Sequence, residues 1–119
     1  MQNQRFEFTT DSSQDAPSQT SQSFNGVFYG FELVLGTSTA VDIDIADANG
    51  VSLFSANALA ASGILMPRIA ATTVAGVALV YAGSDIVGEP APVVGPLTVS
   101  IDQGGVSKTF SIILYIKEA

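Results

Sequence analysis

Four oxygen-bearing side chains, those of Asp42, Asp44, Asp47 and Asn49, fall within eight residues and form the one close grouping that could bind a ligand. Calcium prefers hard oxygen ligands of this kind. In a strand, however, Asp42 and Asp44 would lie on one face about 7 Å apart. The segment also lacks the glycine at loop position six and the terminal glutamate of an EF-hand. We therefore interpret the group as a solvated strand face followed by an Asx-type turn, and we expect no metal there.

The chain contains no cysteine and no histidine. This composition excludes disulfides, thiolate nucleophiles, Ser-His-Asp triads and Cys/His zinc sites. The other acids suggest no paired-carboxylate site, because residues such as Glu32, Asp85, Glu89, Asp102 and Glu118 are scattered along the chain. We expect neither enzyme activity nor a cofactor.

Arg68 stands among apolar residues in a chain that has four cationic side chains. It is either a loop arginine whose stem covers the edge of the core, or a hydrogen-bonding anchor at a protein interface. Arginine and methionine are enriched at interfaces, and Met66 is close by in the sequence. Both residues are therefore candidate interface residues.

A short alternating segment, residues 5–9, is typical of a β-strand. Its aromatic residues, Phe6 and Phe8, are either buried in the body of the protein or anchors that bind a partner. The candidate interface therefore comprises Arg5, Phe6, Phe8, Met66 and Arg68.

Residues 10–23 are almost all Thr, Asp, Ser, Gln, Pro and Ala. Such a tract buries too little apolar surface to offset its ordering entropy. We expect an N-terminal strand on a flexible arm over residues 1–24, and a folded domain over residues 25–119. The strand either joins the protein's own sheet or pairs with the sheet of a neighbour.

The rest of the chain shows residue patterns that are typical of β-strands. Residues 97–102 alternate apolar with polar side chains, and Gly104 and Gly105 supply turn conformations before the apolar residues 110–116, which predicts a hairpin. A second hairpin is predicted at residues 41–54, where Asn49 and Gly50 suit a type I′ turn. Further strands are expected at residues 27–35 and 74–81, a short helix or a buried strand at 58–66, and a long irregular loop with a minor strand at most at 82–96.

These patterns predict an all-β fold, an antiparallel β-sandwich or jelly-roll-like domain of about six to eight strands with an extended N-terminal arm. The length of 119 residues suits one domain. No repeated strand-then-helix pattern that would imply a parallel sheet is present.

Charge and hydropathy limit the partners. The formal net charge of −7 disfavours phosphate backbones and anionic lipid surfaces, so neither nucleic acid nor membrane is expected as a partner. The N-terminal residues lack the apolar core of a secretory signal, and no uninterrupted apolar run reaches the length of a membrane span. Only 13% of residues are charged, so much of the surface is weakly polar or is covered by another protein.

The order of several motifs resembles a group of small head-associated proteins of tailed bacteriophages. The motifs are residues 26–35, the hairpin from Val41 with its Asp-Ala-Asn-Gly turn, the run from Met66 to Arg68, residues 75–81, and the closing residues 103–109. Together they extend over about three-quarters of the chain. They are turns and strand ends rather than active-site signatures, and the first 25 residues lie outside the matching pattern.

This resemblance implies a virion structural protein, made in the cytoplasm of the host bacterium, that decorates and cements the capsid surface. Its implied partners are the major capsid protein and further copies of itself, as a homotrimer. Two alternatives remain: a tail, neck or fibre component of the same virion, and a host-surface adhesion or glycan-binding β-sandwich.

Overall fold

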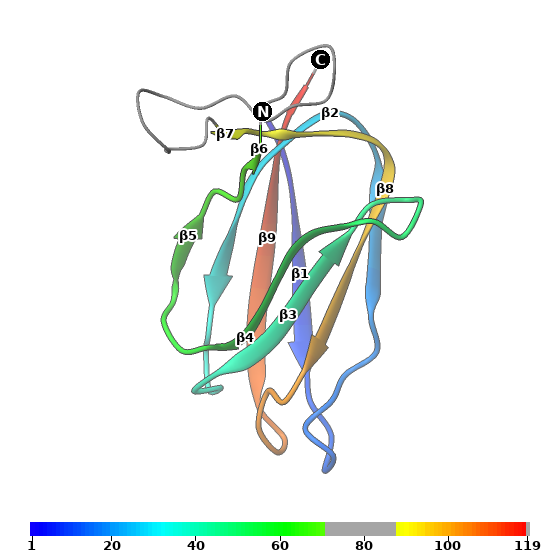
Figure 1. Cartoon of the computed structure of the whole chain (residues 1–119). Helices are drawn as coiled ribbons and strands as arrows, with labels where there is room; N and C mark the ends of the chain where they lie inside the picture. Colours follow the sequence, from blue (N-terminus) through cyan, green and yellow to red (C-terminus); the bar gives the residue numbers. More distant parts are fainter. Residues whose placement is uncertain (71–87, 119) are drawn as a thin grey trace.

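The computed structural model describes residues 1–70 and 88–118, and all regular secondary structure in this part of the chain is β-strand. Seven strands form one antiparallel sheet, while β6 and β7 pair separately with each other (Figure 1). The prediction of an all-β antiparallel fold is confirmed. The strands are β1 (Gln2–Thr9), β2 (Gln19–Val34), β3 (Val41–Ala46), β4 (Ser52–Leu59), β5 (Gly63–Leu65), β6 (Ile69–Ala70), β7 (Gly88–Glu89), β8 (Ala91–Asp102) and β9 (Thr109–Glu118).

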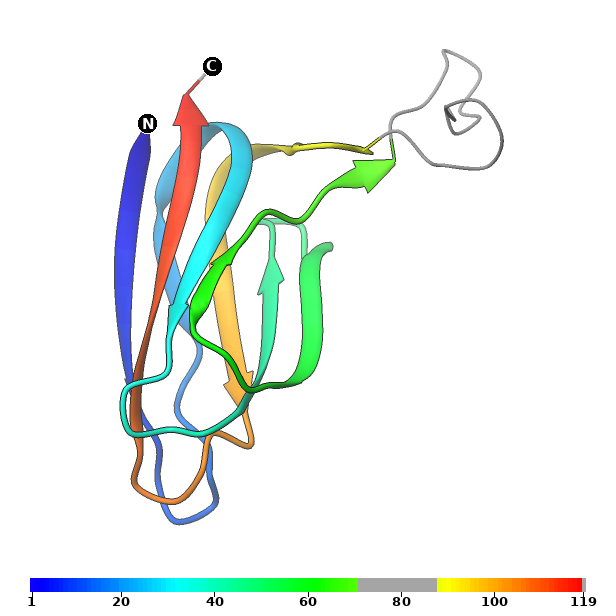
Figure 2. The ribbon, with the colours of Figure 1, turned by 90° about the vertical axis from the view of Figure 1, so that its left-hand side faces the viewer.

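The long strand β2 belongs to both layers of the sandwich. Its residues 19–28 pair with β8 and its residues 26–34 pair with β9, within the sheet order β1-β9-β2-β8-β3-β4. We call β1, β9, the second half of β2 and β5 the first layer, and the first half of β2, β8, β3 and β4 the second layer. Figure 2 shows the two layers in profile, with β5 at the edge of the first layer next to β2. Two breaks in the register of β2, at Thr20/Ser23 and Phe28/Gly30, provide the bulges at which such a strand can bend.

Alternating apolar side chains from both layers fill the space between them. In β1 and β9, Phe8 and Phe110 are paired and their rings stack, with centroids 5.3 Å apart. In β2, Phe31 packs against Phe54 of β4 with centroids 4.9 Å apart. The predicted inward positions of β3 and β8 are all buried: Val41, Ile43, Ile45, Leu97, Val99 and Ile101.

The extended N-terminal arm is not seen. β1 pairs with β9 over eight residues, so the strand joins the protein's own sheet. The following loop is held by hydrogen bonds, and its Ala16 packs against the core: Thr10 N donates to Lys108 O at 2.9 Å, and Gly104 N donates to Gln14 O at 3.0 Å. The composition of residues 10–23 does not reveal these backbone hydrogen bonds, because it indicates only how little apolar surface the segment can bury. β2 begins at Gln19 and runs through the expected boundary at residues 24 and 25.

The hairpin predicted at residues 97–116 is wrong in its pairing, although both of its strands exist. β8 pairs with β2 and β3, whereas β9 pairs with β1 and β2. The intervening turn therefore carries the chain from one layer to the other. Alternation and turn glycines mark strands and reversals, but they do not specify which strand lies alongside. The other hairpin, β3 with β4, is confirmed.

The turn of the β3–β4 hairpin differs from the expected type I′. Gly50 has a φ of +82°, but Asn49 does not have a positive φ. The Asp47 carboxylate instead accepts hydrogen bonds from Asn49 N and Val51 N, both at 2.9 Å, in an Asx-type arrangement. A three-residue loop with one left-handed glycine results.

Two segments that the sequence did not clearly predict as strands contain strands in the structure. Residues 58–66 contain the end of β4 and all of β5, not a helix. Residues 91–96, predicted as loop, begin β8 despite Pro92 and Pro96. These residues pair only with β2, and a one-sided edge tolerates residues that lack an N–H. The strand predicted at 74–81 and the rest of the predicted loop lie outside the described residues.

Candidate functional site

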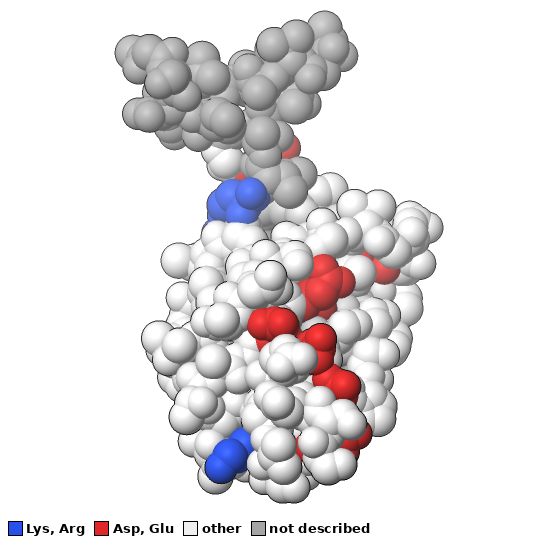
Figure 3. Space-filling model, turned by 60° about the horizontal axis from the view of Figure 1, so that its bottom comes forward, with Lys and Arg blue, Asp and Glu red and all other residues white. Residues whose placement is uncertain are grey.

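The acidic group from the sequence lies on the outer face of the second layer. Asp42 and Asp102 are directly paired across β3 and β8. Asp42 accepts a hydrogen bond from Ala58 N, and Asp44 accepts one from Ser52 Oγ, both at 2.7 Å. Figure 3 shows acidic side chains as a band across this side of the molecule. These carboxylates thus bond to the protein's own strands and turns.

Among residues 1–70 and 88–118, no group of three His, Cys, Asp or Glu side chains lies close enough to hold a metal ion. The shallow hollow beside Asp42, Asp44 and Asp102 measures about 210 Å³ and is open to solvent. Its remaining walls come from small polar residues such as Ser55 and Ser100. The arrangement provides a solvated acidic surface.

Asp15, in the loop after β1, meets Asp102 at the end of β8. Its Oδ1 atom is shielded from solvent and has no hydrogen-bond partner among the described residues. Hydrogen bonding to the Asp102 side chain, then burial, then the negative charges of Asp102 and Asp11 raise the pKa of Asp15 above its ordinary value of 3.8. Two carboxylates in contact favour sharing one proton.

Among the candidate interface residues, Phe6 and Phe8 point into the sandwich. They are only 3% and 1% exposed, as part of the core cluster. Their inward direction fixes the direction of their neighbours, because successive side chains of a strand alternate between its faces. Arg5 and Glu7 therefore lie on the outer face of the first layer.

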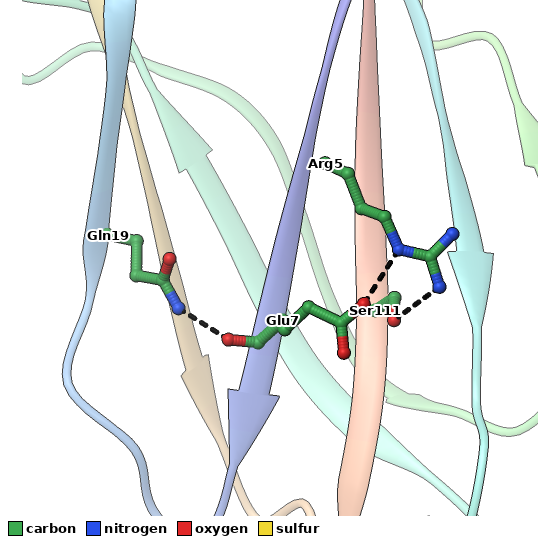
Figure 4. Close-up of polar contacts among 4 residues, drawn as sticks. All are labelled: Arg5, Glu7, Gln19 and Ser111. Carbon is green, nitrogen blue, oxygen red and sulfur yellow. Dashed lines mark hydrogen bonds and ion pairs between the residues drawn. The ribbon is translucent and has the colours of Figure 1, made fainter.

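Arg5 is bonded within the chain on this outer face. Its Nε donates to Glu7 Oε1 at 2.8 Å, and a second guanidinium nitrogen donates to Ser111 Oγ of β9 at 3.0 Å. Nearby, the side-chain amide of Gln19 donates to the backbone oxygen of Glu7 at 2.7 Å, which links β1 to β2 (Figure 4). Arg5 thus contributes a fixed positive charge rather than a freely moving one.

Met66 and Arg68 lie beside Tyr29 of β2. The Arg68 guanidinium donates to Tyr29 O at 2.8 Å, and its central carbon lies 5.4 Å from the centroid of the Tyr29 ring. Met66 is 53% exposed and passes over Gly30. The structure therefore brings Arg5, Met66 and Arg68 to the first layer's outer side, and leaves Phe6 and Phe8 in the core.

Exposed apolar side chains surround this position, and sequence reasoning missed most of them. Ile64 is 63% exposed and lies opposite Glu32 in the β2–β5 ladder. Met1, Tyr29, Gly30, Ile64 and Tyr115 line a hollow of about 290 Å³. We call Met1, Tyr29, Ile64, Met66 and Tyr115 the Tyr29 face. Besides Met66, which the sequence had singled out, the alternation of Tyr115 with the buried residues Leu114 and Ile116 was an available sequence signal for this face.

Tyr115 is oriented by a hydrogen bond. Its hydroxyl donates to Glu32 Oε1 at 2.9 Å. This bond, together with burial and the charge of Glu32, raises the pKa of Tyr115 above its ordinary value of 10.0. The phenol therefore remains a neutral donor at physiological pH, and its ring is held against the hollow.

No known protein-family model, curated protein or solved structure matches this chain. Within the described residues, no helix has the length and apolar character needed to cross a membrane.

Proposed function

We propose that the protein is a non-enzymatic structural component of a virion, which decorates and cements the capsid of a tailed bacteriophage. Its partners are the major capsid protein and further copies of itself, arranged as a homotrimer. The resemblance of its motifs to small phage head proteins supports this assignment. The antiparallel sandwich supports it too, because a rigid sheet can present a fixed surface to a neighbouring protein.

The observation that carries the proposal is the Tyr29 face. Ile64 and Met66 are 63% and 53% exposed, and they lie side by side with Tyr29 and its stacked Arg68. Apolar and aromatic side chains next to an arginine are the composition typical of protein interfaces. A surface of this kind favours protein contact over catalysis.

The charge distribution agrees with a protein partner. Eleven acidic and four basic residues leave the chain too negative to favour nucleic acid or anionic lipid. A glycan-binding role needs an aromatic ring free for stacking, whereas one side of the Tyr29 ring is occupied by Arg68. The capsid role is therefore favoured over adhesion.

Co-sedimentation with emptied, expanded phage shells tests the function. We expect the wild-type protein to pellet with shells at a fixed ratio to the major capsid protein, and bound shells to resist heating better than bare ones. Absence of binding to shells, with binding to purified tails instead, would replace the capsid role by a tail or neck role.

A further inference from the structure

The Tyr29 face shares the outer side of the first layer with most of the chain's cationic residues. Arg5 and Lys117 lie at outward positions of β1 and β9, and Arg68 covers Tyr29. These are three of the four cationic residues in the protein. The outer side of the first layer also carries Glu7 and Glu32. Glu118 follows Lys117 at the end of β9, and Glu89 pairs with Ile69, the residue after Arg68, so positive and negative groups there nearly balance.

The loops and the second layer have the opposite character. In the part of the chain that the structure describes, they carry Asp11, Asp15, Asp42, Asp44, Asp47 and Asp102, with Lys108 as their one cation. Asp42, Asp44 and Asp102 occupy the outer face of the second layer. Two copies that approached through this acidic face would bring like charges together.

The centre of the Tyr29 face is apolar and recessed. Gly30 lets the Leu65–Met66 segment approach β2 closely, because a Cβ at this position would lie 2.5 Å from Leu65 O and 3.1 Å from Met66 Cγ. The hollow of about 290 Å³ lies next to this contact, and Ile64 and Met66 are exposed beside it. The exposed apolar side chains of one copy can therefore enter the hollow of the other copy, and the reverse. A self-complementary contact requires this reciprocal fit.

We propose that the Tyr29 face binds a second copy of this chain. Each copy carries a net charge of −7, and the copies repel least where the local charge is balanced. Because the face carries both signs around an apolar centre, the arginines of one copy can meet the glutamates of the other while the apolar centres are buried. This contact is two-fold, so within the proposed function it joins copies that belong to neighbouring trimers on the shell rather than copies within one trimer.

Salt dependence follows from this charge distribution. The apolar contact is insensitive to screening, whereas the long-range repulsion between two copies is reduced as the Debye length falls below about 10 Å. Raising the salt concentration from about 0.05 M to about 0.5 M should therefore strengthen self-association. An association held mainly by ion pairs would weaken instead.

Sedimentation equilibrium of the full chain tests the proposal with two variants that add the same charge. Ile64→Asp places a carboxylate in the Tyr29 face, and Val94→Asp places one on β8 of the second layer, where Val94 is 78% exposed. We expect the wild-type protein to self-associate, Ile64→Asp to weaken association by about tenfold or more, and Val94→Asp to change it by less than about threefold. Circular dichroism and thermal unfolding establish that both variants remain folded.

The possible results separate this inference from the proposed function. A wild-type protein that stays monomeric and still covers shells overturns the inference and retains the function. Equal weakening by both variants also overturns it, because the contact would then not be specific to the Tyr29 face. If the protein self-associates, Ile64→Asp abolishes this association, and the protein does not bind shells, the inference is supported and the capsid role is ruled out.

Discussion

Phe8 and Phe110 lie opposite each other in the β1–β9 ladder, and their rings stack at an interplanar angle of 16°. Phe8 is 1% exposed, so most of its surface is buried by this pairing and by the core behind it. The N-terminal strand is therefore held to the domain by side-chain packing as well as by backbone hydrogen bonds.

Phe8→Ala should lower the free energy of unfolding by about 3–5 kcal/mol, because it leaves a cavity where a whole ring was buried. Urea denaturation followed by circular dichroism measures this change. The matched control is Glu7→Ala, an exposed neighbour in the same strand, which should change stability by less than about 1 kcal/mol. A loss below about 1 kcal/mol for Phe8→Ala would mean that β1 does not contribute to the core in solution.

The contact between Asp15 and Asp102 should make stability depend on pH. A raised pKa means that the folded state binds the proton more tightly than the unfolded state does. The free energy of unfolding should therefore increase as pH falls from neutral, through the raised pKa, towards the ordinary value of 3.8, with no further increase from this group below it. At neutral pH the negative charge of Asp15 therefore opposes folding.

Asp15→Asn should stabilise the protein at pH 7, because the amide can donate a hydrogen bond to Asp102 where a carboxylate repels it. It should also reduce the gain in stability on acidification. Glu118→Gln, which removes one negative charge at the end of β9, is the control for net charge and should leave that gain intact. Chemical denaturation at a series of pH values measures both effects, and a less stable Asp15→Asn at pH 7 would contradict this account.

Gly30→Ala should displace β5 and Met66 from β2. The added Cβ would lie 2.5 Å from Leu65 O, a distance that requires the backbone of that segment to move. We expect faster amide hydrogen exchange in Gly63–Leu65 and a loss of about 1–3 kcal/mol in stability. Gly50→Ala serves as the comparison, because its Cβ would meet nothing within 4 Å and only its φ of +82° would be strained. Unchanged exchange in β5 for Gly30→Ala would show that this contact is looser than described.

Much of the fold could be predicted from alternation alone. Val41, Ile43 and Ile45 are buried as their spacing required, and the same holds for Leu97, Val99 and Ile101. Partner choice could not be predicted, because β8 and β9 are neighbours in sequence yet pair with the two halves of β2. That outcome depends on the bend in β2, which no local pattern specifies.

The candidate site was predictable only in part. Arg68 could be identified as a candidate interface residue because a cation among apolar residues is rare. It does lie beside Met66 on the outer surface. Phe6 and Phe8 were ambiguous because aromatic residues serve cores and interfaces equally well. The exposure of Ile64 could not be predicted, because the three residues of β5 are too few to show an alternating pattern. It follows from the position of β5 beside β2.

The shared strand β2 has a mechanical consequence. Since one covalent backbone runs through both layers, a pull on one outer face is transmitted to the other along peptide bonds as well as through side-chain packing. Sliding the layers past each other would require the ladders of β2 with β8 or β9 to unzip. The sandwich should therefore resist shear as a single stiff tile, whichever of its faces is pulled.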